Sequence, residues 1–389
     1  MEKYRYVHLF TIDSFIFNKA FQHLMYNRQD IEDHLFLYMH KKSFSAVEAD
    51  NRSNCILEEG PFDVSTIRNA LDKGQYLFIH NLGTFPGSEI CKLTDEEANR
   101  IIWSIWGPDL FMFSVPKIQS KFYLLAQKIY RSLMYGYKEC VRRTNEDIYF
   151  KKIKTINKIS KFKAICAGFE GDIDKIHSLF PKVPCIQSIY SSDVYLEDIA
   201  EWQKKNPEDD SNNENIKILL GHSGDDFLQH EKWLDKLLPY KEKLEFYLPL
   251  SYGRQEYIQS LIIKAKELYG DRAHIFTDLM STEEYFTKIL SKVDFAIFDF
   301  PQQSAYGNAL FLLLLGKKLF YPNNSTMYNT FTKNNVEVYK TEDLTIECLT
   351  ELKKTPSSEN NINFGKKRFD KKILAGLWND VFKFLEEER

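Results

Sequence analysis

The stretch Leu219-Leu220-Gly221-His222-Ser223-Gly224-Asp225 decides how this chain should fold. It ends an apolar run, Ile216–Leu220, that is typical of a buried strand. The two glycines that follow predict a turn whose backbone N–H groups, with the positive end of the next helix, can bind an anion. A turn that only reverses the strand into a helix is the equal alternative.

Similar apolar runs recur along the chain and alternate with longer helical patterns, which favours parallel sheets flanked by helices. Before the middle of the chain they are Tyr6–Ile12, His34–Met39, Tyr76–His80, Ile101–Trp106, Ala164–Ala167 and Cys185–Ile189; after it they are Ile216–Leu220, Leu244–Leu248, Ala273–Phe276, Phe295–Phe298 and Lys318–Tyr321. We therefore expect an α/β protein with doubly wound, Rossmann-like sheets.

The chain has 389 residues, more than one hydrophobic core usually serves. The stretch 203–215 carries a proline and almost no apolar residue, so it reads as a linker. We expect one domain at 1–202 and a second at 216–368. The closing segment 369–389 has apolar residues at helical spacing and predicts an amphipathic helix.

Composition narrows the class of protein. With 43% hydrophobic and 15% aromatic residues the chain is globular, and a net charge of −3 argues against a general polyanion-binding protein. Its six cysteines form no CxxC pair, so we expect reduced thiols and neither a disulfide frame nor a metal site. The first residues lack a signal core, and the longest apolar run, Ala309–Leu315, cannot span a bilayer. We expect a cytoplasmic protein.

Two more loops of small and polar residues should lie at the same sheet edge as the glycine turn. One is Leu248–Gly253, which includes Tyr252, and the other is Phe298–Asn308, which includes Gln302, Gln303, Gly307 and Asn308. Their amides and hydroxyls suit the hydroxyls and phosphates of a sugar nucleotide. An ordinary helix cap explains the second loop as well.

The first half of the chain supplies candidate proton acceptors at the ends of its strands. They are Asp13, His80 and Asp109. A carboxylate or imidazole at such a position can take a proton from an attacking hydroxyl. Each could instead cap a helix or satisfy a buried backbone group.

These motifs resemble one known family. The segment Trp103–Leu110, with Trp103, Trp106 and Gly107, resembles the Trp-x-Ile-Trp-Gly-x-Asp-Leu segment of bacterial 4-acetamido-4,6-dideoxygalactose (Fuc4NAc) transferases of enterobacterial common antigen synthesis. Ile218–Asp225 is similar to that family's Ile-Leu-Val-Gly-Asn-Ser-Gly-Asp, and His230 falls on a histidine there. Tyr252 and the Gln302–Gly307 region match its later loops.

The resemblance implies a GT-B glycosyltransferase that is inverting and metal-independent, with a dTDP-linked donor and a polyprenyl-diphosphate-linked saccharide as acceptor. It implies no cofactor, since the nucleotide-sugar is a substrate. The donor side would comprise Gly221, His222, Ser223, Gly224, Asp225, Tyr252, Gln302, Gln303, Gly307 and Asn308. The acceptor side would comprise Trp103, Trp106 and Gly107 with the catalytic candidates Asp13, His80 and Asp109, and the last helix would pack back on the first domain.

Two features depart from that family. His222 stands where the family has asparagine, and Ser304–Tyr306 lengthens the interval from the glutamines to Gly307. Both changes concern the donor side, so they leave the transferred sugar open. The Asp172-Ile173-Asp174 triplet matches the Asp-x-Asp signature of metal-dependent transferases, but a turn and N-cap explains it more simply.

The stretch 117–163 holds thirteen Lys or Arg residues against three acidic ones, with aromatic residues between them. Such a surface favours anionic lipid headgroups, and solvated helix faces look similar. We expect an enzyme on the cytoplasmic face of the inner membrane. A UDP- or GDP-sugar donor for capsule or other surface glycans is the first alternative, and a non-enzymatic nucleic-acid-binding protein is the second.

Overall fold

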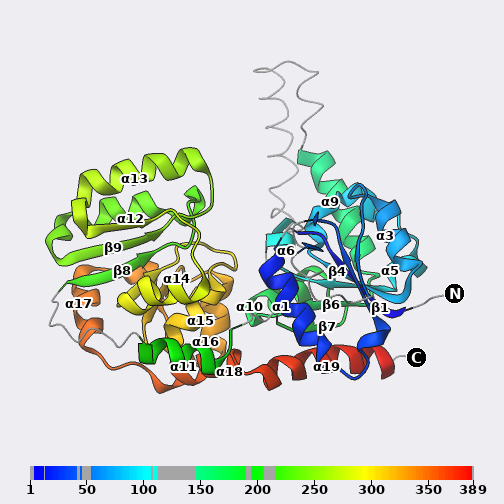
Figure 1. The fold of residues 1–389 in the computed structure, drawn as a ribbon. Helices are drawn as coiled ribbons and strands as arrows, with labels where there is room; N and C mark the ends of the chain where they lie inside the picture. Colours follow the sequence, from blue (N-terminus) through cyan, green and yellow to red (C-terminus); the bar gives the residue numbers. More distant parts are fainter. Residues whose placement is uncertain are drawn as a thin grey trace, which may run out of the picture. The chain divides into compact units, whose positions relative to one another are not determined.

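A computed structural model gives the structure of residues 4–12, 14–41, 44–45, 54–106, 108–112, 145–189, 194–205 and 215–387. The chain forms two compact units, each built on its own parallel sheet (Figure 1). Unit 1 comprises Met1–Gly168, Asp172–Tyr190 and Leu377–Arg389, and unit 2 comprises Phe169–Gly171 and Ser191–Gly376.

The sheet of unit 1 has seven strands in the order β3-β2-β1-β4-β5-β6-β7. They are β1 (Tyr4–Phe10), β2 (His34–Tyr38), β3 (Cys55–Leu57), β4 (Gly74–His80), β5 (Ile101–Ser104), β6 (Ala164–Ala167) and β7 (Cys185–Gln187). All pairs are parallel, as the alternation of strands and helices predicted. The sequence did not reveal β3, because the apolar run of this edge strand is only three residues long.

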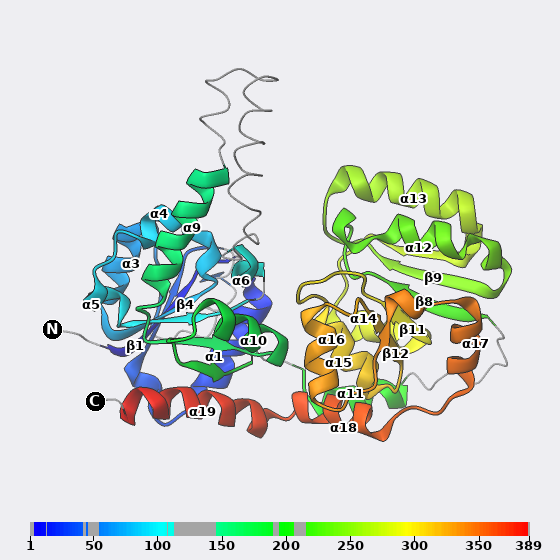
Figure 2. The ribbon, with the colours of Figure 1, turned by 180° about the vertical axis from the view of Figure 1, so that it is seen from behind.

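Helices cover both faces of this sheet. They are α1 (Phe15–Tyr26), η1 (Ile31–Asp33), α3 (Val64–Leu71), η2 (Leu82–Thr84), α4 (Gly87–Ile90), α5 (Asp95–Ala98), α6 (Pro108–Met112), α9 (Asn145–Ile159), α10 (Glu170–Leu179) and α19 (Lys371–Glu387). Val7 and Leu9 point to the core shared with α3, α9 and α10. Since side chains alternate along a strand, His8 and Phe10 point to the opposite face, where α1 supplies Phe21. Figure 2 shows α3, α4, α5 and α9 gathered beside the sheet.

The sheet of unit 2 has six strands, all parallel, in the order β10-β9-β8-β11-β12-β13. They are β8 (Ile216–Leu220), β9 (Leu244–Pro249), β10 (Ala273–Phe276), β11 (Phe295–Ile297), β12 (Lys318–Tyr321) and β13 (Tyr339–Lys340). Chain order reverses between β8 and β11, which is where open α/β sheets bind ligands.

Two cores sandwich this second sheet. One packs it against α12 (His230–Leu237), α13 (Gln255–Tyr269) and α17 (Ile346–Lys354). The other packs it against α11 (Leu196–Lys205), α14 (Thr282–Lys288), α15 (Tyr306–Leu314), α16 (Thr326–Lys333) and α18 (Glu359–Arg368). Short 3-10 turns complete the unit at η3 (Asp226–Leu228), η4 (Leu238–Lys243), η5 (Gly270–Arg272), η6 (Leu290–Lys292) and η7 (Thr341–Asp343). The predicted two-domain, Rossmann-like architecture is thus confirmed.

The boundary between the units lies earlier than the sequence suggested. Unit 2 begins at Ser191, so α11 belongs to it, and residues 203–205 of the expected linker are helical. These last three residues of α11 resembled a linker because they are polar and exposed. At the other end, α19 begins in unit 2, and its part from Leu377 onward belongs to unit 1.

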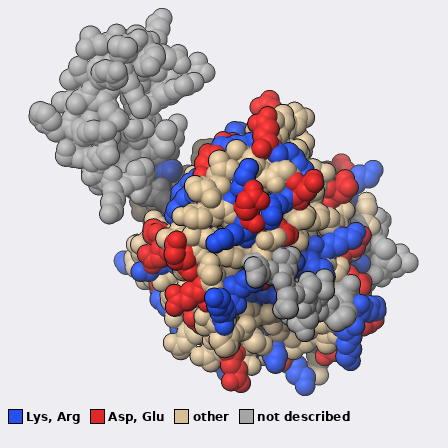
Figure 3. Space-filling model, turned by 90° about the vertical axis from the view of Figure 1, so that its left-hand side faces the viewer, with Lys and Arg blue, Asp and Glu red and all other residues tan. Residues whose placement is uncertain are grey.

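Charged residues of both signs share the molecular surface. On the face in Figure 3, the described Lys and Arg side chains are interspersed with Asp and Glu side chains. Of the basic stretch 117–163, the described part begins at Asn145 with α9, and residues 117–144 lie outside the described ranges. Among the described residues, no helix is both long and apolar enough to cross a membrane.

Candidate functional site

The glycine turn after β8 is held in a backbone conformation that requires glycine. Gly221 has φ +70°, and a Cβ there would lie 2.3 Å from His230 Nε2. Its N–H donates to the carbonyl oxygen of Ile297 at 3.1 Å. The residue therefore lets the chain turn tightly over the buried His230.

Gly224 has a comparable packing role. Its N–H donates to the Tyr252 carbonyl oxygen at 2.7 Å, and a Cβ would come within 2.1 Å of Ile258. The amides of both glycines thus donate to carbonyl oxygens of the protein, and their expected role in holding a diphosphate stays a prediction that this geometry does not favour. Glycine is needed at both positions for conformation and close packing.

Ser223 and His222, the other side chains of the turn, also contact neighbouring residues. Ser223 is fully buried, and its Oγ donates to Asp225 Oδ2 at 2.8 Å. His222 Nδ1 lies 3.2 Å from the Tyr252 hydroxyl, which joins the turn to the loop after β9. Burial lowers the pKa of His222 to about 4, so its imidazole is neutral at pH 7.

A cavity of about 180 Å³ opens beside this pair, within unit 2. His222, Tyr252 and Asn308, all expected on the donor side, line it together. Asn308 comes from the first turn of α15, and its Nδ2 donates to the Tyr285 hydroxyl at 3.0 Å. The other lining residues are Pro249, Ser251, Phe276, Asp278, Leu279, Met280, Tyr285 and Ile289. The cavity therefore has a mixed polar and apolar lining at the carboxyl ends of β8, β9 and β10.

Sequence reasoning missed the contribution of the loop after β10. Asp278, Leu279 and Met280 follow that strand, and Tyr285 lies on α14 behind a capping box of Ser281 and Glu284. The signal was available, because the Ser-x-x-Glu pattern marks a helix start after a strand. The loop contains no glycine, so it does not have the pattern of an anion-binding turn.

The other seven expected donor-side residues do not line this cavity, and three of them belong to the loop before α15 or to its start. Gln302 and Gln303 are half-buried in the turn before α15, and Gly307 is exposed on its first turn. A Cβ at Gly307 would meet nothing within 4 Å. Packing therefore does not demand glycine at this position.

On the acceptor side, Asp109 is fully engaged in unit 1. Its carboxylate accepts from Trp103 Nε1 at 2.8 Å and from the Trp106 N–H at 3.0 Å. Burial raises the pKa of Asp109 to about 6, although those hydrogen bonds act to lower it. Asp109 is 1% exposed, so it holds the tryptophan loop and is not presented to an acceptor as a base. Gly107 lies outside the described residues.

His80 is likewise buried, with 1% of its surface exposed. Its Nε2 lies 3.1 Å from His8 Nδ1, and burial lowers its pKa to about 3. In this structure His80 therefore faces the protein interior, and a role as general base is a prediction that its burial does not favour. The third candidate, Asp13, lies outside the described residues.

The Asp-x-Asp triplet does not form a paired carboxylate site. Asp172 is buried and Asp174 is exposed, so the two side chains of α10 have different environments. Burial, and then the nearby Asp109 charge, raise the pKa of Asp172 to about 7. Among the described residues no group of three or more His, Cys, Asp or Glu could hold a metal ion.

Comparisons with known proteins agree with this architecture. A family model described as 4-alpha-L-fucosyltransferase, glycosyl transferase group 56, matches residues 143–377. Comparison with curated protein sequences gave no significant match.

Among solved structures, Anabaena HepE in complex with UDP and glucose is similar, with a TM-score of 0.61, 10% identity, and 98% of this chain and 99% of that chain covered. A glycosyltransferase from Rickettsia africae has a TM-score of 0.60 at 10% identity, covering 99% of both chains. Sucrose-phosphate synthase from Thermosynechococcus elongatus has a TM-score of 0.59 at 9% identity, covering 99% of this chain and 100% of its own. At such identities the likeness concerns the fold, which is that of GT-B glycosyltransferases.

Proposed function

We propose that this chain, which belongs to the 4-alpha-L-fucosyltransferase family of glycosyl transferase group 56, transfers a 4-acetamido-4,6-dideoxy sugar from a dTDP-linked donor. The acceptor is a polyprenyl-diphosphate-linked saccharide of cell-surface polysaccharide synthesis. The family match makes the chain a glycosyltransferase, and the donor, the acceptor and an inverting, metal-independent course are the proposal.

The observation that carries the donor side is the cavity at the ends of β8, β9 and β10. It lies next to the point where strand order reverses, the usual ligand position in open α/β sheets. Asp278 is its only carboxylate and no lysine or arginine lines it, so it suits a neutral part of the donor better than the diphosphate. The first-turn amides of α15, which begins after Ala305 at φ 53°, are the proposed diphosphate donors.

Stabilisation of the departing diphosphate is the step that this chain must provide. As negative charge develops on the leaving oxygens, oriented N–H donors at a helix start lower the barrier without reorganising. Asp13 is the proposed base that removes the acceptor proton. In the sequence it comes three positions after the last residue of β1, whereas His80 and Asp109 are buried and hydrogen-bonded.

Nucleotide binding tests the donor side. We expect dTDP to raise the melting temperature more than UDP or GDP, since a ligand at 100 times its Kd stabilises by about 2.7 kcal/mol. Asn308→Ala should weaken that shift, and the same change at Asn329, exposed on α16, should not. A larger shift with UDP or GDP would favour the alternative donors, as HepE was solved with UDP. No shift with any of them would contradict the donor site.

Turnover tests the base. Asp13→Asn should lower kcat by about 10²–10⁴-fold, the usual share of general-base catalysis, with the dTDP shift unchanged. Asp72→Asn, at the exposed end of α3, is the matched control. Near-normal turnover by Asp13→Asn would remove this residue from the mechanism.

The site of action is proposed as the cytoplasmic face of the inner membrane. The basic and aromatic stretch 117–163 would bind anionic headgroups there, and α9 is its described part. Binding of nucleic acid by this stretch is the less favoured alternative.

A further inference from the structure

Three histidines form a continuous buried row across the sheet of unit 1. His8 Nδ1 lies 3.1 Å from His80 Nε2, and His8 Nε2 lies 2.9 Å from His34 Nδ1. The residues come from the neighbouring strands β1, β4 and β2, and each is at most 1% exposed. His80 ends β4 and His34 begins β2, so the row runs from the carboxyl edge of the sheet to the opposite edge.

Aromatic side chains enclose this row. Phe10 stacks on His80 with ring centroids 4.3 Å apart, and Phe78 stacks on His8 at 4.7 Å. Phe21 of α1 and Phe382 of α19 cover the face at 5.2 Å from His8 and 5.0 Å from His34. Burying a polar nitrogen among aromatic rings costs free energy unless it is hydrogen-bonded. The two N–H···N contacts reduce this cost for the three imidazoles.

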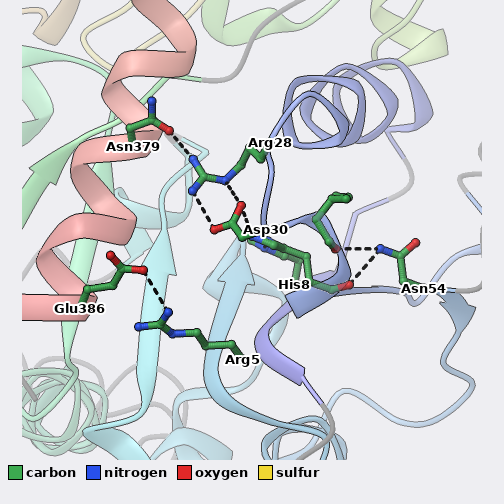
Figure 4. Close-up of polar contacts among 9 residues, drawn as sticks. Arg5, His8, Arg28, Asp30, Asn54, Asn379 and Glu386 are labelled. Atoms are coloured by element: carbon green, nitrogen blue, oxygen red, sulfur yellow. Dashed lines mark hydrogen bonds and ion pairs between the residues drawn. The ribbon is translucent and has the colours of Figure 1, made fainter.

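The Arg28–Asp30 ion pair lies at the His34 end of the row. Arg28 donates from Nε and Nη2 to the two carboxylate oxygens of Asp30, at 2.8 and 2.9 Å (Figure 4). Burial acts to raise the pKa of Asp30, but its contacts with His34 and Arg28 hold it below the usual range. Asp30 Oδ1 lies 3.7 Å from His34 Nε2, which is longer than a hydrogen bond but close enough for the charge to act.

Geometry then determines where each proton lies. A neutral imidazole has one N–H donor and one acceptor nitrogen, and His8 uses both nitrogens, so both contacts must point the same way along the row. The Asp30 carboxylate favours the proton on His34 Nε2, which leaves His34 Nδ1 as an acceptor. His8 must then donate from Nε2, and His80 must donate from Nε2 to His8 Nδ1.

We propose that the Arg28–Asp30 ion pair acts through His34 and His8 to hold His80 in its Nε2–H tautomer, and thereby positions the acceptor-side turn of unit 1. His80, His8, His34 and Asp30 are positioning residues in this scheme. The scheme gives none of them a contact with substrate.

His80 is joined to the turn through its backbone carbonyl oxygen, so its ring acts on the turn by fixing the position of the residue. The Thr11 hydroxyl donates to the His80 carbonyl oxygen at 2.7 Å and lies 2.8 Å from that of Asn81, while Thr84 donates to Thr11 at 2.9 Å. Asn81 adopts φ 69°, a conformation that must be held by its surroundings. Thr11 lies two positions before Asp13, so the part of this proposal that concerns the acceptor rests on the proposed function.

An added proton would disturb this order. If it enters at His80 Nδ1, the Nε2 protons of His80 and His8 must each pass to the next ring, and the charge ends on His34 beside Asp30. The charged groups that act on the row, among the described residues, are Arg28, Asp30 and Asp33. The helices packed against the row contribute uncharged residues, namely Phe21 of α1 and Trp378 and Phe382 of α19. Asn379 of α19 is hydrogen-bonded to Arg28.

Nitrogen NMR of histidine-labelled full-length protein tests the tautomers without any assay of sugar transfer. At neutral pH we expect His8, His34 and His80 to give neutral Nε2–H signals, with hydrogen-bonded Nδ1 at His8 and His34. Wild-type signals from the Nδ1–H tautomer or from imidazolium would overturn the proposal, whether or not the chain proves to be a glycosyltransferase.

Asp30→Asn tests the origin of the order. It keeps the shape of the side chain and removes its charge, so we expect mixed tautomers at His34 and a KM for the acceptor raised by about tenfold or more through misplacement of the turn. The Kd for dTDP should not change. Glu386→Gln is the matched control, since it removes the 2.9 Å ion pair with Arg5 on the same unit (Figure 4) and leaves the row intact.

Two outcomes separate this proposal from the proposed function. Unchanged tautomers in a folded Asp30→Asn variant would overturn the role of the ion pair while leaving sugar transfer standing. Should that variant not fold, Arg28→Lys keeps the charge but not the paired contact, and it must then shift the His34 signals for the proposal to hold. Ordered tautomers in a protein without transferase activity would contradict the proposed function alone.

Discussion

At the scale of single residues, the glycines after β8 have separate physical reasons for being there. Gly221 is held at φ +70° with its Cα against His230 Nε2, whereas Gly307 faces open space. We predict that Gly221→Ala lowers the free energy of unfolding by about 2–4 kcal/mol, from backbone strain and a clash in a packed region. Urea denaturation measures it.

Gly307→Ala is the control for that substitution. With no atom within 4 Å of the new Cβ on α15, it should leave stability unchanged or raise it by about 0.5–1 kcal/mol. Equal stability of the two variants would show that the turn tolerates a side chain and that its glycines serve another purpose.

At the scale of elements, α9 carries the described part of the basic stretch. Lys158 is paired with Asp95 at 2.7 Å, while Lys154 is exposed. We predict that reversing Lys151, Lys152 and Lys154 to Glu weakens binding to anionic vesicles by tenfold or more, at about 1 kcal/mol per charge near the surface. Sedimentation with vesicles at low and high salt measures it.

Reversal of Lys366, Lys367 and Lys372, exposed on α18 and α19, is the matched control and should have a smaller effect. If the α9 variant still sediments as the wild type does, the basic stretch is not the membrane contact.

At the scale of the whole molecule, buried imidazoles make stability depend on acidity. Burial lowers the pKa of five histidines, namely His8, His34, His80, His222 and His230. The folded state therefore binds fewer protons than the unfolded one below about pH 6.5, so stability falls as pH falls, by about 1.4 kcal/mol per unit for each such group. Asp109 and Asp172 oppose this, because their raised pKa values favour the folded state as pH falls from about 7.

Since the histidines outnumber the opposing carboxyls, we predict a net loss of stability as the pH falls from about 6.5 to 5. Urea denaturation at a series of pH values measures this loss. His222→Asn should flatten the curve, and His177→Asn, at an exposed position on α10, should not. A curve that is level or rising toward pH 5 would mean that the histidines are protonated in the folded protein.

The sequence by itself determined the architecture and part of the donor site. Its short apolar runs became parallel strands, and His222, Tyr252 and Asn308 came together because each follows a strand or begins a helix at the same sheet edge. Such features are local, since strand period and turn residues depend on neighbours in the chain. The edge strand β3 and the loop after β10 were missed because they lack those local signals.

Only the tertiary structure decided what the titratable residues do. His80 and His8 are 72 positions apart in the chain, yet their rings are hydrogen-bonded. The Gly224 N–H donates to the Tyr252 carbonyl oxygen. Residue type shows that an imidazole, a carboxylate or an amide can act on a ligand. Whether the group acts on a ligand depends on how deeply it is buried and on whether a distant residue is already its hydrogen-bond partner. Both depend on tertiary packing.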